Sequence, residues 1–87
     1  RALTYIVTRN AVERGGSPER MHAAMLALFS ANMVETVASE ALQIHGANGY
    51  QQGHPLEYLY RDIRGWRIGA GTDEIQKTTV AEAALGL

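Results

Sequence analysis

Cysteine is absent from this chain of 87 residues, which excludes a disulfide framework and any thiolate metal site. A charge excess is absent as well: eight Lys and Arg stand against nine Asp and Glu, a net charge of −1. We therefore expect no nucleic-acid partner and no anionic membrane surface. No apolar run is long enough to predict a membrane-spanning segment. With 46% hydrophobic and 20% charged residues, residues 1–87 read as one small globular domain.

Patterns for metal binding or nucleophilic catalysis are also missing. The three histidines are His22, His45 and His54, and no pair of them has the spacing of metal ligands. No order of Ser, His and Asp indicates a triad, and the serines occupy positions typical of caps and helices. The sequence therefore predicts neither a metal centre nor a serine nucleophile.

What the chain does contain is helical periodicity, interrupted at three places by glycine and proline. Apolar residues recur at steps of three and four in four segments, and none alternates with period two. The predicted helices cover residues 1–14, 18–44, 55–66 and 72–87. Four helices with short connections predict an all-α fold, an antiparallel four-helix bundle.

Capping residues set the predicted ends of these helices. Gly15 and Gly16 fit a left-handed end to the first helix. Ser17 followed by Pro18 fits an N-cap and a first helical residue. Thr72 fits an N-cap for the last helix, with two acidic residues in the first turn.

The long second helix carries a polar stripe, formed by Asn32, Glu35, Ser39 and Gln43. These steps of three and four keep the four side chains on one face. Two interpretations stay open, a solvated face and a face turned toward a polar partner or ligand.

Two glycine-containing loops are candidates for ligand contact. In "IGAGTDEIQ", residues 68–76, glycines flank Ala70 just before a helix, whose free N–H groups suit phosphate or a polarised carbonyl oxygen. A plain turn between helices fits equally well. "HGANGY", residues 45–50, fits a helix end and turn, and no strand precedes it as a phosphate-binding fingerprint requires.

Three motifs in register resemble the C-terminal helical domain of acyl-CoA dehydrogenases. They are "ALQIHGANGY", "PLEYLYRDIRGWRI" and "GAGTDEIQ", and the resemblance covers nearly the whole chain. It implies oxidation of an acyl-CoA thioester to the 2,3-enoyl-CoA with FAD as cofactor. It also implies transfer of the electrons to an electron-transfer flavoprotein or another acceptor, and a homo-oligomer, dimer or tetramer. The implied location is the cytoplasm in a bacterium and the mitochondrial matrix in a eukaryote.

The resemblance assigns site residues on two segments. The FAD-binding residues it implies are Gln43, Ile44, His45, Gly46 and Ala47, on a turn that touches the FAD of a neighbouring subunit, and Thr72, Asp73 and Glu74 at a helix start. The substrate-binding residues it implies are Gly69, Ala70 and Gly71. Ala47 stands where the family usually has a second glycine, which is tolerable if its φ is negative.

The catalytic glutamate of many family members falls at Ala70, so this chain has no catalytic residue of its own. Some members, isovaleryl-CoA dehydrogenase among them, also read "IGAGT" and take their base from an earlier helix. We therefore expect an excerpt, inactive alone, whose N-terminal and middle domains and base lie upstream. Gly69, in place of a bulky aromatic residue, suggests branched or bulky acyl groups. A catalytically degenerate homologue and a helical oligomerisation module remain alternatives.

Overall fold

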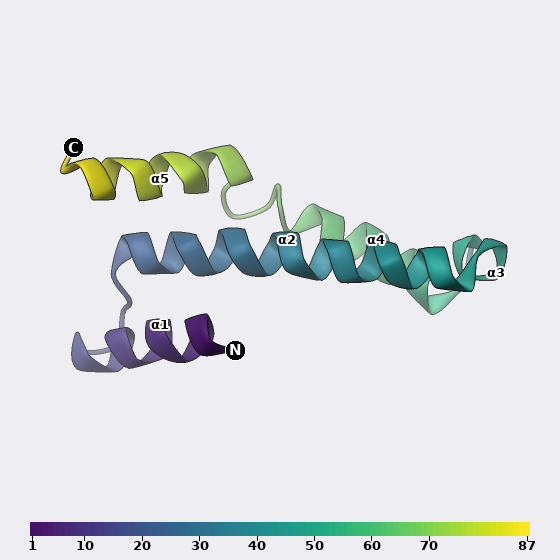
Figure 1. Cartoon of the computed structure of the whole chain (residues 1–87), viewed down its shortest axis with the longest axis horizontal. Helices are drawn as coiled ribbons and strands as arrows, with labels where there is room; N and C mark the ends of the chain where they lie inside the picture. The colour runs from purple at the N-terminus through teal and green to yellow at the C-terminus, as the bar shows by residue number, and fades with distance from the viewer. The chain divides into compact units, whose positions relative to one another are not determined.

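The regular secondary structure of the chain is all α-helix, and a computed structural model describes all 87 residues. Five helices follow one another, α1 (Ala2–Glu13), α2 (Arg20–His45), α3 (Ala47–Tyr50), α4 (Pro55–Gly65) and α5 (Asp73–Leu85) (Figure 1). The all-α prediction is confirmed, and four of the helices match the four predicted segments. The short α3 was not predicted as a helix. The residues form two compact units, Arg1–Phe29 with Asp73–Leu87, and Ser30–Thr72, which are described separately.

The first unit consists of α1, the beginning of α2 and α5. Both α1 and α5 lie along the first part of α2 (Figure 1). The most buried apolar residues here are Val7 on α1 and Ala24 on α2, at 5% and 3% exposure. Thr79 on α5 is also buried, and its hydroxyl donates to the Ile75 carbonyl one turn earlier, which satisfies a polar group inside the unit.

Glycine ends α1 as the sequence predicted. Gly15 has φ 87°, and its N–H donates to the Val12 carbonyl at 3.2 Å. The N–H of Gly16 reaches back to the Ala11 carbonyl at 2.7 Å. This pair of bonds is the Schellman motif, which satisfies two carbonyls that have no partner within the helix.

The predicted start of α2 was wrong by two residues. The helix begins at Arg20, so Ser17 is not its N-cap and Pro18 is not its first helical residue. The backbone N–H of Glu19 donates instead to the side-chain oxygen of Asn10 on α1, at 2.7 Å. A side chain from a neighbouring helix therefore satisfies a donor at this helix start.

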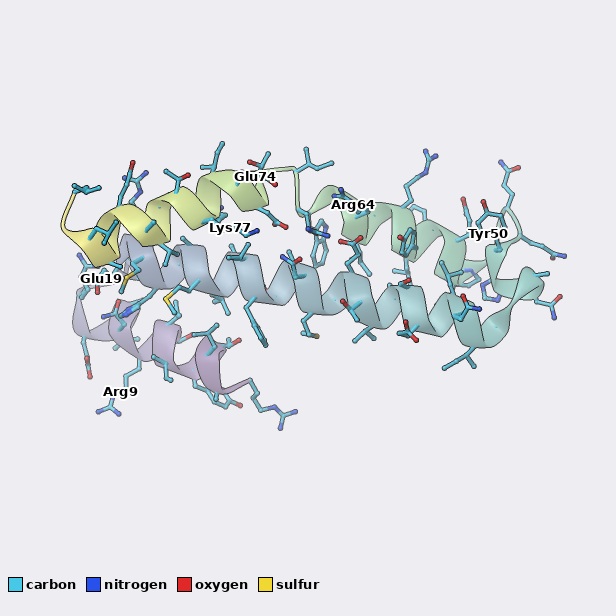
Figure 2. All side chains as sticks on the ribbon, turned by 45° about the horizontal axis from the view of Figure 1, so that its top comes forward. Arg9, Glu19, Tyr50, Arg64, Glu74 and Lys77 are labelled. Carbon is cyan, nitrogen blue, oxygen red and sulfur yellow. The ribbon has the colours of Figure 1, made fainter.

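In the second unit, α4 runs antiparallel to the C-terminal part of α2. A Cβ on Gly49 of α3 would lie 3.4 Å from Leu42 on α2 and 3.6 Å from Leu56 on α4, so the three helices meet there. At the opposite end of α4, Arg64 forms an ion pair with Glu35 of α2. Tyr50 and Arg64 mark these two ends in Figure 2.

An unpredicted cap starts α4. Nδ1 of His54 accepts a hydrogen bond from the N–H of Leu56 at 3.1 Å, and Pro55 is the first helical residue. Proline is well placed there because the first N–H of a helix has no intrahelical acceptor.

Many large apolar side chains remain exposed, as expected for a small domain rich in alanine. Tyr5 and Val12 on α1 are 66% and 72% exposed, and Phe29 and Val37 on α2 are each 60% exposed. Exposed apolar surface of this kind is typical of faces that cover other protein surfaces. The prediction that the helices form one antiparallel four-helix bundle concerns both units together, and it stays a prediction.

Helix α2 also has the length and composition of a membrane-spanning helix. Its 26 residues include an 18-residue window of mean hydropathy 1.2. A core helix of a soluble protein passes the same test, so this single helix is weak support for a membrane span. The expectation that no membrane is involved stays a prediction.

Candidate functional site

The loop of residues 69–72 is an accessible break between two helices. It follows α4 and ends where α5 begins, at Asp73. Gly69 and Ala70 are exposed, and Gly71 and Thr72 are half-buried. The loop is tied to the end of α4, since the N–H groups of Ile68 and Gly69 both donate to the Gly65 carbonyl, at 3.0 and 2.8 Å. Its backbone is therefore both anchored and reachable from outside.

Ala70 adopts a backbone conformation that is uncommon for a residue with a side chain. Its φ is 58°, and it is the one non-glycine residue of the chain with positive φ. The next residue, Gly71, has φ 111°. A left-handed alanine costs about 1–2 kcal/mol, so the surrounding structure must hold it there. The exposed methyl group of Ala70 offers no proton acceptor, so the loop itself supplies no base.

The three residues implied in FAD binding at the start of α5 differ in exposure. Thr72 immediately precedes the first helical residue, as an N-cap does. Asp73 is only 5% exposed, whereas Glu74 is exposed. Asp73 is therefore placed to support the helix start, and Glu74 is the carboxylate that an external ligand could reach. Both acidic groups lie where the helix dipole favours negative charge.

The second implied segment, residues 43–47, is an exposed corner between α2 and α3. Gln43, Gly46 and Ala47 line an open hollow of about 490 Å³. Its other lining residues are Ser39, Leu42, Tyr50 and Tyr60. Ile44 is 83% exposed and His45 is also exposed. Gly46 has φ 59° and nothing within 4 Å of where a Cβ would stand, so a ligand could approach its backbone closely.

Ala47 fits this corner without strain. It is the first residue of α3, and it is not among the residues with positive φ. An alanine was expected to be tolerable here if its φ is negative, and this condition is met.

The two segments lie toward opposite ends of α4. Residues 43–47 adjoin the α3 end, and residues 69–72 follow the last turn of α4. The 11 residues of α4 correspond to a rise of about 16 Å. Residues 43–47 and 69–72 are therefore separated along α4, and their contact with a ligand stays a prediction.

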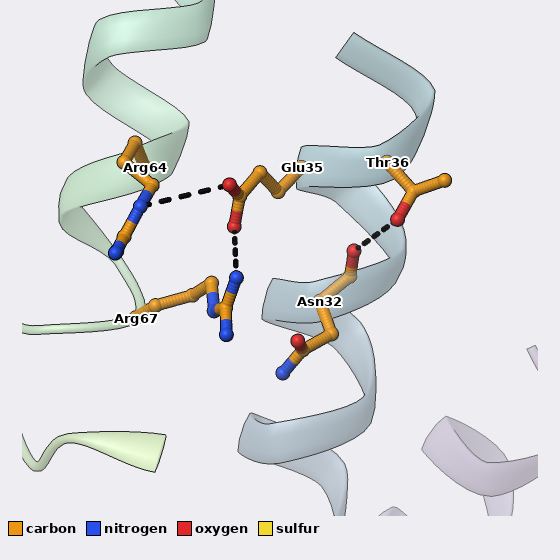
Figure 3. A network of polar contacts seen from close by, with 5 residues as sticks. All are labelled: Asn32, Glu35, Thr36, Arg64 and Arg67. Carbon is orange, nitrogen blue, oxygen red and sulfur yellow. Dashed lines mark hydrogen bonds and ion pairs between the residues drawn. The ribbon is translucent and has the colours of Figure 1, made fainter. Parts of the chain in front are cut away.

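Glu35 of the polar stripe is paired with arginines at and just beyond the end of α4, and both interpretations of the rest of the stripe stay open. Oε2 of Glu35 accepts a hydrogen bond from Nη1 of Arg67 at 2.6 Å, and Oε1 lies 3.6 Å from Nε of Arg64 (Figure 3). Glu35 is 16% exposed at its side chain. Asn32, Ser39 and Arg67 line a small hollow beside it, of about 220 Å³.

Sequence reasoning missed this cluster of Glu35, Arg64 and Arg67. The stripe on α2 and the arginines near the end of α4 were each visible in the sequence. Glu35 and Arg67 are 32 positions apart, however, so no local pattern pairs them. The signal that could have predicted this contact is the antiparallel course of α4 along α2. It follows from the bundle prediction once the register of the two helices is known.

Two of the three histidines make structural contacts in this arrangement. His45 contacts the Ala41 carbonyl through Nδ1 at 2.9 Å, and its ring lies 5.8 Å from that of His54. His54 caps α4. No group of three or more metal-binding side chains is present.

Comparison with known proteins gives this arrangement a family. Residues 1–85 match the family described as "Acyl-CoA dehydrogenase, C-terminal domain". The chain therefore belongs to this family, as the three motifs implied.

Several curated proteins are similar over most of the chain. Acryloyl-CoA reductase (NADH) of Anaerotignum propionicum is 38% identical over 74 residues, which cover 85% of this chain and 19% of that protein. For 3-sulfinopropanoyl-CoA desulfinase of Paraburkholderia xenovorans the identity is 36%, over 98% of this chain and 22% of the relative. Mitochondrial isovaleryl-CoA dehydrogenase of Oryza sativa subsp. japonica is 36% identical, with shares of 92% and 19%. The chain thus spans about a fifth of the length of these relatives.

Proposed function

We propose that this chain is the C-terminal helical part of an FAD-dependent enzyme that oxidises an acyl-CoA thioester to the 2,3-enoyl-CoA. The main support for this proposal is the loop of residues 69–72, which is an accessible break between helices. The loop contains the family motif, with the methyl group of Ala70 in place of the carboxylate. In this proposal the loop contacts the substrate, and the base comes from another part of the protein.

The residues on both segments fit contacts to FAD. The hollow beside Gln43 combines a carboxamide, a tyrosine-lined wall and the open backbone of Gly46. At the start of α5, Thr72 lies beside the exposed carboxylate of Glu74, which can accept hydrogen bonds from a nucleotide. The separation of the two segments along α4 supports their contacting two different flavins, one of them bound by a neighbouring subunit.

The role of this chain in the reaction is binding and orientation. Bound FAD supplies the acceptor for the hydride that leaves the substrate Cβ. Gly69 and Gly71 carry no side chain, so the thioester can lie close against their backbone. Because Ala70 has no proton acceptor, a carboxylate elsewhere must remove the Cα proton. We infer that this base lies on an upstream helix, as in the subgroup with the same "IGAGT" motif.

The substrate class is supported by the relatives, and the acyl group by the loop. The names of the three relatives above each contain an acyl-CoA, while the reactions named are reduction, desulfination and dehydrogenation. Gly69 has no side chain where a larger one would narrow the site, which favours branched or bulky acyl groups. The exposed apolar side chains support a homo-oligomer, and an electron-transfer flavoprotein is the electron acceptor we propose.

A first test uses the product of the complete reading frame that contains this chain. Purified protein should carry FAD, and anaerobic addition of isovaleryl-CoA or butyryl-CoA should bleach its flavin absorbance.

A second candidate function is that of a homologue that binds flavin and acyl-CoA without oxidising the acyl-CoA. The missing carboxylate at Ala70 favours it. It predicts bound FAD that no acyl-CoA reduces, whereas a product without FAD would refute both.

A second test addresses the geometry of the loop. In a variant whose native base has been replaced by glutamine, Ala70→Glu should restore measurable oxidation, because it places a carboxylate in the loop beside the proposed substrate. Ala70→Gln is the matched control, since it has nearly the same size and the same backbone strain but no basic carboxylate. Equal rates for the two variants, with FAD still bound, would count against this loop lying at the substrate Cα.

A further inference from the structure

Glu35 joins α2 to the segment that leads into the loop. One carboxylate oxygen accepts from Arg67 at 2.6 Å, and the other lies 3.6 Å from Arg64 (Figure 3). Arg64 lies in the last turn of α4, and Arg67 lies just beyond it. One carboxylate therefore holds the end of α4 and the residues that follow it.

Partial burial strengthens the interaction of Glu35 with Arg67, whereas Arg64 is 46% exposed and lies farther away. The side chains of Glu35 and Arg67 are 16% and 30% exposed. By contrast, the pair of Arg9 and Glu13 on α1 is 82% and 62% exposed. Exposed pairs contribute little because water screens them, whereas a short charged hydrogen bond in a half-buried site is roughly twice as strong as a neutral one.

The held segment leads directly into a strained backbone. Arg67 is followed by Ile68 and Gly69, whose N–H groups share the Gly65 carbonyl, and then by Ala70 with φ 58°. An alanine stays in this conformation only if neighbouring contacts fix the chain on either side of it. The ion pair at Arg67 is such a contact on the N-terminal side.

We propose that Glu35 is a positioning residue for residues 68–72. Through Arg67 it keeps the loop in the conformation in which Gly69 and Ala70 are exposed and Gly71 is half-buried. That the presented surface orients an acyl-CoA thioester rests on the function proposed above. The holding of the loop itself does not depend on that function.

The test measures hydrogen exchange in the product of the complete reading frame. Glu35→Ala and the milder Glu35→Gln, which keeps the shape of the side chain, are compared with Glu13→Gln, which breaks the exposed ion pair on α1. In Glu35→Ala, amides of residues 68–72 should exchange about tenfold or more faster, as the loss of a charged hydrogen bond allows. Glu35→Gln should give a smaller increase, and Glu13→Gln should leave this segment unchanged. Exchange within twofold of wild type, or equal acceleration in every helix, would overturn the proposal.

Steady-state kinetics then separates positioning from general support. Glu35→Gln should raise the KM for acyl-CoA several-fold while FAD content is unchanged. Faster loop exchange with an unchanged KM and kcat would overturn the link to substrate. If the wild-type protein oxidises no acyl-CoA, the proposed function fails, while the exchange comparison still decides whether Glu35 holds the loop.

Discussion

Replacing Gly49 by alanine tests the packing of α3 against the end of α2. A Cβ at this position would lie 2.7 Å from Cβ of His45, whereas carbon atoms prefer about 3.5–4.0 Å. The Cβ of His45 is fixed to its backbone and cannot rotate away, so α3 would have to shift against the end of α2. Overpacking of this kind costs about 1–3 kcal/mol, and alanine returns about 0.5–1 kcal/mol through its greater helix propensity.

The cost therefore exceeds the gain, and Gly49→Ala should destabilise the fold by about 1–2 kcal/mol. Thermal unfolding followed by circular dichroism should show a Tm lower by roughly 4–8 °C per kcal/mol for a domain of this size.

Gly65→Ala is the matched control for this change. Gly65 is the last residue of α4, its φ is not positive, and nothing lies within 4 Å of its missing Cβ. The same substitution should there raise stability by about 0.5–1 kcal/mol. If Gly49→Ala were as stable as wild type, or if both variants shifted Tm in the same direction, the packing of α3 on the end of α2 would be wrong.

Three further substitutions test single features. His54→Ala removes the acceptor of the Leu56 N–H and should cost about 1 kcal/mol in urea unfolding, while an unchanged midpoint would show that the cap contributes nothing. Ala70→Val should destabilise the fold by more than about 1 kcal/mol, because a β-branched residue tolerates positive φ poorly. Ala70→Gly should be neutral or stabilising. If the Val variant had a higher Tm than the Gly variant, the left-handed conformation of Ala70 would be contradicted. Gly69→Phe should fold normally, since its Cβ would lie at an ordinary 3.5 Å from the Gly65 carbonyl. If the loop limits the size of the acyl group, this variant should lower kcat/KM for isovaleryl-CoA more than for butyryl-CoA.

Features encoded by neighbouring residues were predicted well from the sequence. Gly15 and Gly16 end α1 as expected, because positive φ at a helix end is a local property of glycine. Thr72 stands at the start of α5 for the same kind of reason. Family membership was also predictable, since three motifs in register are specific even though each alone is weak.

Features that depend on a distant partner were missed or wrong. Ser17 had the composition of an N-cap, but Asn10 on another helix satisfies the Glu19 N–H, and α2 starts later. The single turn of α3 was not predicted as a helix, because four residues are too few to show a period of 3.6.

The sequence by itself determined the helical class, most helix boundaries, the family and the absence of a carboxylate at Ala70. These follow from period, caps and motifs, which are all local. Only the tertiary structure decided that Glu35 of the polar stripe meets arginines near the end of α4 and that the two implied binding segments lie apart. The reason is physical: which polar groups meet depends on the register of α4 against α2, and that register is set by packing between residues on different helices, such as Leu42, Gly49 and Leu56.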